Sequence, residues 1–227
     1  MYCPKCKKDD PQNREMRPDC GYPVKPIPAP PGGKTSFGGY DWFVLDKQDG
    51  KALILSEIIT CDRQYHKTDM DITWSKCDLR VFLNNGFYNS FDEQDKARII
   101  KTRVTTPVQP WHGTDGGEDT DDYVFILSVQ EVVKYFGDSG DLDSRFGWWA
   151  SMEGMWLGNG FGQILVDQYN NSRMAKKENG NAAGYMTRTP GRLNKFVTGV
   201  TDDGRIGMTG VGVAGWNGVR PAMWINL

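Results

Sequence analysis

The chain has 227 residues, of which 38% are hydrophobic and 25% are charged. This length accommodates one sizeable domain with a small appendage, and the composition predicts a globular protein and excludes a disordered one. The formal net charge of −2 lacks the positive excess that nucleic-acid binding requires, so we expect no nucleic-acid partner.

Signals for membrane insertion and export are missing from the sequence. No apolar run approaches the roughly 20 residues that a transmembrane helix needs. The polar residues 1–6 lack the apolar core of a signal peptide. These features predict a cytoplasmic protein without membrane insertion, and they do not address display at a cell or virion surface.

Residues 1–24 carry three of the five cysteines in a pattern typical of zinc ribbons. Cys3 and Cys6 form a Cys-x-x-Cys knuckle, and Cys20-Gly21 matches the end of a second knuckle. A complete ribbon holds zinc through four thiolates, but Arg17 occupies the position where the second pair would begin. Either another side chain or water completes the shell, or the site is degraded and the three thiols are unliganded.

A structural zinc site at Cys3, Cys6 and Cys20 predicts that the purified protein contains about one equivalent of zinc. Cys6→Ser removes one thiolate and should release the metal, which elemental analysis would detect. The main domain should keep its melting temperature, because a proline-rich linker separates it from the ribbon. Metal-free protein with an ordered ribbon would contradict the site.

Residues 25–34 are rich in proline and glycine and predict a linker, which leaves residues 35–227 as the main domain. Aromatic and branched side chains at residues 40–45 and 51–56 predict two strands. Asp49-Gly50 tolerates the positive φ angles of a tight hairpin turn and predicts the connection between them.

Three Ser-x-x-acid patterns predict helix starts at Ser75, Ser90 and Ser128. In each, the serine hydroxyl accepts from a free backbone N–H and the acid reaches back. Residues 123–127 predict a buried strand between the second and third helices. Glycine-punctuated loops and short hairpins follow, and Asp203-Gly204 is their clearest turn signal.

Two polar motifs allow more than one interpretation. Residues 115–122 hold five carboxylates, and such loops either bind calcium or form solvated acidic turns. The residues around Ser139 resemble the nucleophile motif of chymotrypsin-like proteases. However, Asp141 stands where that motif has glycine, and its charge would oppose an oxyanion. We therefore interpret Ser139 as part of a polar loop.

Short motifs spread along the main domain carry a resemblance, at residues 37–45, 50–56, 73–75, 79–80, 82–84, 87–88, 122–128, 135–136, 188–191 and 218–227. Together they resemble a large bacterial and phage family of uncharacterised domains, often preceded by a zinc ribbon. That family is related to the C-type-lectin-like fold of formylglycine-generating enzymes and of variable proteins of diversity-generating retroelements. One departure is Tyr-Met-Thr-Arg-Thr-Pro-Gly at residues 185–191, where the family usually has Trp-Trp-Leu-Arg-Ser-Pro-Gly.

The resemblance implies an α+β fold of the C-type-lectin-like kind, preceded by the zinc-ribbon-like segment. Two or three helices, small antiparallel sheets and long loops are expected, with residues 40–45 pairing with residues 220–226. The enzymatic relatives need a late cysteine pair or a histidine cluster. No cysteine follows Cys77, and His66 and His112 are the two histidines, so neither chemistry is supported.

The resemblance therefore implies a non-enzymatic variable protein that displays side chains of its C-terminal segment to an unknown protein or carbohydrate ligand. In such proteins core residues stay fixed between diversified positions, so Val197, Ile206 and Val213 are expected to be buried. The alternatives are an enzyme of the formylglycine-generating-enzyme-like superfamily with unknown reaction, and a structural domain without diversification. The expected ligand-binding residues are Arg192, Asn194, Lys195, Phe196, Arg205, Met208, Thr209, Val211, Ala214 and Trp216.

Overall fold

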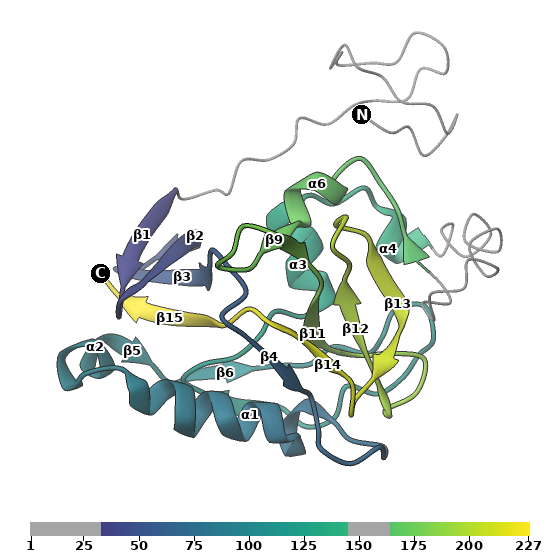
Figure 1. Ribbon diagram of the computed structural model, residues 1–227, viewed down its shortest axis with the longest axis horizontal. Coiled ribbons are helices and arrows are strands. Elements are labelled where there is room, and N and C mark those ends of the chain that lie inside the picture. The colour runs from purple at the N-terminus through teal and green to yellow at the C-terminus, as the bar shows by residue number, and fades with distance from the viewer. Residues whose placement is uncertain (1–32, 145–163) are drawn as a thin grey trace, which may run out of the picture.

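The computed structural model describes residues 33–144 and 164–227. These residues form a mixed α+β fold, in which two larger sheets and two small hairpins are accompanied by short helices (Figure 1). The predicted zinc ribbon, with Cys3, Cys6 and Cys20, lies outside the described residues. None of the helices in the described ranges has the length and apolar character to cross a membrane.

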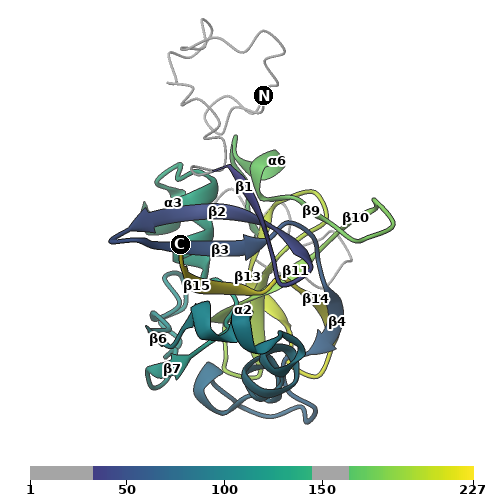
Figure 2. The same ribbon diagram turned by 90° about the vertical axis from the view of Figure 1, so that its left-hand side faces the viewer.

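The first larger sheet has five antiparallel strands in the order β1-β2-β3-β15-β5 and is shown in Figure 2. It confirms the hairpin predicted from residues 40–45 and 51–56. Asp49 and Gly50 both have positive φ, 51° and 73°, as a tight two-residue turn requires. The strands are β1 (Lys34–Phe37), β2 (Tyr40–Gln48), β3 (Lys51–Ser56), β5 (Ile99–Ile100) and β15 (Ala222–Asn226).

The C-terminal strand pairs with β3, so the expected pairing with β2 was wrong. Ala222 lies opposite Leu55, and Asn226 lies opposite Lys51. A strand has two edges, and both edges of β2 are occupied by close neighbours in the chain, β1 and β3. Strand β15 therefore takes the free edge of β3.

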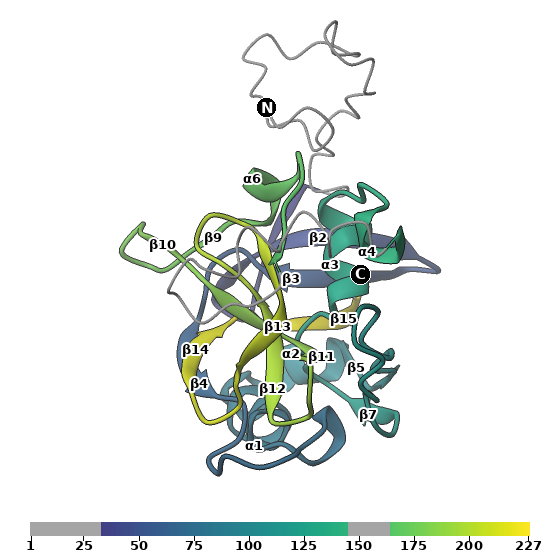
Figure 3. The ribbon, with the colours of Figure 1, turned by 90° about the vertical axis from the view of Figure 1, so that its right-hand side faces the viewer.

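The second larger sheet has six strands in the order β4-β14-β11-β12-β13-β8 and is shown in Figure 3. Its pairs are antiparallel except for β11 with β14, which is parallel. The predicted turn at Asp203-Gly204 is confirmed between β12 and β13, where Gly204 has a φ of 81°. The strands are β4 (Cys61–Gln64), β8 (Ile164–Leu165), β11 (Tyr185–Pro190), β12 (Phe196–Val200), β13 (Ile206–Gly212) and β14 (Trp216–Val219).

Two short hairpins and the remaining turns complete the described chain. One hairpin joins β6 (Thr102–Val104) to β7 (Thr120–Asp122), and the other joins β9 (Ala175–Lys176) to β10 (Ala182–Ala183). The short helical segments besides those discussed below are η2 (Leu83–Phe87), α4 (Asp141–Ser144) and α6 (Asn170–Arg173).

The third predicted helix start is confirmed, because Ser128 and Glu131 form a reciprocal capping box at α3 (Val129–Phe136). The first two were wrong by two residues. Cys77 caps α1 (Asp78–Phe82) and Asp92 caps α2 (Glu93–Arg98). An N-cap needs extended backbone, whereas Ser75 and Ser90 lie inside two 3₁₀ turns. These turns are η1 (Trp74–Lys76) and η3 (Tyr88–Ser90).

Residues 123–127 are largely buried, as predicted, but they do not form a strand. Phe125 makes one isolated bridge to Ala222. Side chains satisfy other backbone groups of this segment: Asn84 Nδ2 donates to Val124 O, and Arg188 Nη1 donates to Ile126 O. A buried carbonyl needs a hydrogen-bond donor, but the donor can be a side chain. The Asn84 and Arg188 side chains therefore supply the hydrogen bonds that a neighbouring strand would otherwise make.

Arg220 joins the two larger sheets from the connection between β14 and β15. Its side chain is buried, and Nε donates to Ser56 O at 2.8 Å. The rings of Phe43, Phe136 and Tyr185 surround the guanidinium, with centroids 5.3–5.4 Å from Cζ. Cation–π contacts and hydrogen bonds to carbonyls thus hold the charge at the junction.

Candidate ligand-binding surface

Residues 191–195 connect β11 to β12, and the neighbouring strand β13 fixes the backbone of this turn. Arg192 N donates to Thr209 O at 2.9 Å, and Val213 N donates to Lys195 O at 3.0 Å. Gly191 N also donates to Phe196 O across the turn. The turn is therefore held to the end of β13 on both of its sides.

Two loops from the first half of the chain support the same turn. Ile72 N donates to Asn194 O at 3.2 Å, and Thr114 Oγ1 donates to Arg192 O at 3.0 Å. With its backbone engaged in this way, the turn exposes the side chains of Arg192, Leu193 and Lys195.

Trp216 begins β14 three residues after Val213, whose N–H donates to Lys195 O of this turn, and it is 70% exposed. Its backbone pairs with Gln64 of β4, whose Nε2 donates to Ala214 O at 2.8 Å. Val213 and Val219, on either side of it in the chain, are fully buried. The indole is thus presented to solvent from a backbone that is fixed by its neighbours.

The β11–β12 turn, the β13–β14 turn and the loop of residues 66–72 meet at one end of the six-stranded sheet (Figures 1 and 3). We call the exposed and half-buried side chains there the presenting surface. Its residues are Met70, Arg192, Leu193, Asn194, Lys195, Phe196, Thr209, Val211, Ala214 and Trp216.

Eight of the ten predicted residues lie on this surface. Of the other two, Arg205 has a partly exposed side chain but lies elsewhere, whereas the expected exposure of Met208 was wrong. Met208 is fully buried. Side chains two apart on a strand point to the same face, so the buried position of Ile206 already requires Met208 to face the core. Arg205 lies at the other end of β13, beside Asp203 in the β12–β13 turn. Six residues of extended strand place it about 20 Å away.

The expected core positions between the displayed residues are confirmed. Val197 is 1% exposed, and Ile206 and Val213 are fully buried. Sequence reasoning missed Leu193 and Met70, which are 50% and 47% exposed. Leu193 could have been found from its place between two predicted residues. Met70 carries no such signal, because only tertiary contact brings its loop to the turn.

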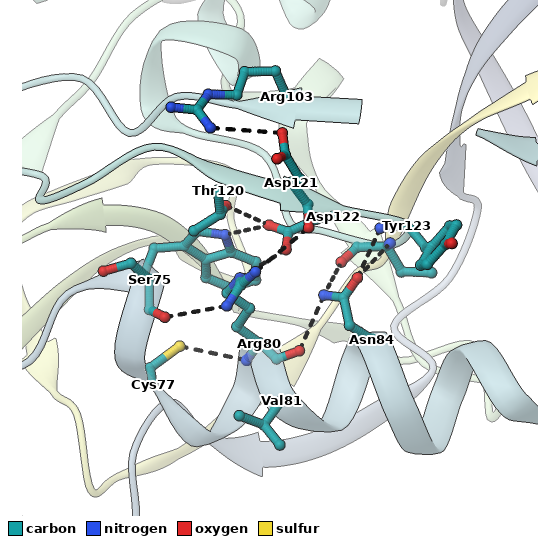
Figure 4. Close-up of polar contacts among 12 residues, drawn as sticks. Ser75, Cys77, Arg80, Val81, Asn84, Arg103, Thr120, Asp121, Asp122 and Tyr123 are labelled. Atoms are coloured by element: carbon teal, nitrogen blue, oxygen red, sulfur yellow. Dashed lines mark hydrogen bonds and ion pairs between the residues drawn. The ribbon is translucent and has the colours of Figure 1, made fainter. Parts of the chain in front are cut away.

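Three of the five acidic residues at 115–122, Asp119, Asp121 and Asp122, pair with arginines within the domain. Asp122 is fully buried and accepts from Arg80 Nε at 2.7 Å, from Trp74 Nε1 at 2.9 Å and from Thr120 Oγ1 at 2.6 Å. Figure 4 shows this carboxylate enclosed between α1 and the β6–β7 hairpin. Each of its two oxygens therefore accepts at least one of these hydrogen bonds.

Two exposed acids of the same stretch contact Arg103: Asp119 at 3.4 Å and Asp121 at 3.7 Å. In the ranges 33–144 and 164–227, no group of three or more His, Cys, Asp or Glu side chains could hold a metal ion. The contacts of residues 119–122 are ion pairs and hydrogen bonds within the domain.

Two groups with nucleophilic potential have structural roles. Ser139 lies between α3 and α4, where its Oγ accepts from Asp141 N at 3.3 Å. Cys77 caps α1, and burial raises the pKa of its thiol to about 12, so the thiol stays protonated at neutral pH. His66 lies elsewhere, with Nδ1 2.9 Å from Asp78 Oδ2.

The fold and this surface define a class of protein: an α+β domain that presents side chains from one end of a sheet. The chain matches the family described as "Domain of unknown function (DUF6273)" over residues 49–227, most of its length, and it belongs to that family. It matches no curated protein and no solved structure.

Proposed function

We propose that the protein is a non-enzymatic ligand-binding module that uses the presenting surface. The observation that carries this proposal is Trp216, an exposed indole on a fixed strand between buried valines. Tryptophan is enriched among the residues that dominate binding energy, and a preorganised anchor lowers the entropic cost of binding. Leu193 and Met70 add exposed apolar area to the same surface.

More specifically, we propose that the domain has a C-type-lectin-like fold and that the protein is a variable protein of a diversity-generating retroelement. Buried Val197, Ile206 and Val213 support it, because displayed positions can then change without altering the core. A zinc ribbon at the N-terminus would be a structural appendage. A template repeat and a reverse transcriptase gene next to the coding sequence would support diversification, and their absence would favour an undiversified structural domain.

The surface can be tested with a random peptide display library and a glycan array, which cover the two expected ligand classes. Ligands selected on the wild-type protein should lose at least about tenfold in affinity for Leu193→Ser/Lys195→Ser/Trp216→Ser. This loss corresponds to about 1.4 kcal/mol, which is typical of removing one anchor. The melting temperature should change little, because exposed positions contribute about 0.5 kcal/mol or less each.

Val81→Ser is the matched control, since Val81 is 54% exposed on α1 and lies outside the presenting surface. It should leave both affinity and stability unchanged. Ligands that bind the triple variant as tightly as the wild type would contradict the proposed function.

A further inference from the structure

Two cations of the presenting surface lie near one aromatic ring, and neither pairs with a carboxylate among the residues that the structure describes. Arg192 Cζ lies 5.1 Å and Lys195 Nζ lies 5.6 Å from the centroid of the Phe196 ring. Neither cation makes an ion pair with another residue in the part of the chain that the structure describes. By contrast, Arg103 and Lys177 contact carboxylates.

The positive potential of this pair reaches the adjoining loop. Burial lowers the pKa of His112, and the Arg192 guanidinium lowers it further. The same loop supports the turn through the Thr114 bond to Arg192 O. Because the backbone of Arg192 and Lys195 is fixed by hydrogen bonds, the two charges are presented from a preorganised frame.

We propose that the presenting surface binds an acidic segment of a protein partner, with its carboxylates against Arg192 and Lys195 and an apolar side chain against Phe196 and Trp216. Guanidinium groups bind carboxylates through paired hydrogen bonds, and clusters of such cations recognise acidic motifs. The half-buried Phe196 ring near both cations provides the apolar contact. This inference rests on the proposed function and specifies the chemistry of its ligand.

A short polypeptide fits the surface better than a nucleic acid does. Asp69 and Asp71 are exposed on the loop whose Ile72 N–H donates to Asn194. A long polyanion that covered the cations would also meet these carboxylates. The protein also has a net charge of −2, whereas nucleic-acid binding depends on an extended basic surface. A segment with a few carboxylates can avoid this repulsion.

The test uses fluorescence anisotropy with a labelled, glutamate-rich peptide that contains a central leucine and tryptophan. The full-length protein should bind it, and added salt should weaken the binding. Arg192→Glu/Lys195→Glu should lower the affinity at least tenfold and should create binding of the matching lysine-rich peptide. Lys47→Glu/Lys51→Glu changes the net charge equally at exposed positions of the other sheet and should leave the affinity within about twofold.

Three results would overturn the acidic-segment inference: no binding of the glutamate-rich peptide, equal binding by the charge-reversed variant, or tighter binding of heparin or single-stranded DNA. The proposed function is tested separately. It fails if ligands selected from the peptide and glycan libraries bind the Leu193/Lys195/Trp216 triple variant as tightly as they bind the wild type. If those ligands are neutral and still require Leu193 and Trp216, the surface binds ligands but the inferred acidic chemistry is wrong.

Discussion

Met208→Asp is expected to abolish folding. Met208 is fully buried within the hydrophobic core, and β13 is covered on both edges by β12 and β8. A carboxylate at this position would be buried among apolar side chains. It would either keep an unpaired charge or take up a proton at neutral pH, and both cost free energy. The expected cost is at least about 4 kcal/mol, a large part of the stability of a domain of this size.

Leu193→Asp is the matched control, because it places the same charge on a leucine that is 50% exposed. Its free energy of unfolding should stay within about 0.5 kcal/mol of the wild type. Urea denaturation followed by circular dichroism measures both variants. A stable Met208→Asp protein together with an unfolded Leu193→Asp protein would show that the two faces are assigned the wrong way round.

Asp122→Ala is expected to destabilise the protein by about 3 kcal/mol. The substitution leaves the Arg80 guanidinium, the Trp74 indole N–H and the Thr120 hydroxyl without their shared acceptor. Trp74 is fully buried, whereas the Arg80 side chain is 25% exposed, so water can compensate in part for the arginine alone. Asp122→Asn keeps one carbonyl oxygen and should have an intermediate effect.

The neighbouring carboxylate offers the control for this prediction. Asp121 is 56% exposed and lies 3.7 Å from Arg103, which is 62% exposed. Exposed ion pairs contribute about 0–1 kcal/mol, so Asp121→Ala should be nearly neutral in a thermal melt. An Asp122→Ala protein as stable as Asp121→Ala would mean that the buried network does not stabilise the junction of α1 with the β6–β7 hairpin.

Several elements followed from the sequence because their signals are local. The β2–β3 hairpin depends on two adjacent residues that accept positive φ, and Asp49-Gly50 supplies both. The capping box of α3 needs only Ser128 and Glu131, three residues apart. The buried positions Ile206 and Val213 were expected from the resemblance to a family whose core residues stay fixed between displayed positions.

Competition between neighbouring signals explains the helix starts that were wrong. Ser75 and Ser90 have the side chains of good caps, but each lies in a 3₁₀ turn, where the backbone does not have the extended conformation of an N-cap. Cys77 and Asp92 follow these turns with extended backbone and cap instead. The side-chain pattern was present, and the backbone path decided between the caps.

The sequence by itself determined the α+β class, the β2–β3 and β12–β13 hairpins, and most residues of the presenting surface. Only the tertiary structure decided that β15 pairs with β3 and that the loop of residues 66–72 reaches the turn at Asn194, through Ile72. Hairpins and caps arise from groups a few residues apart, so local sequence suffices for them. Edge occupancy and loop contacts join residues more than a hundred positions apart, and their free energy depends on which other elements have already taken the available partners.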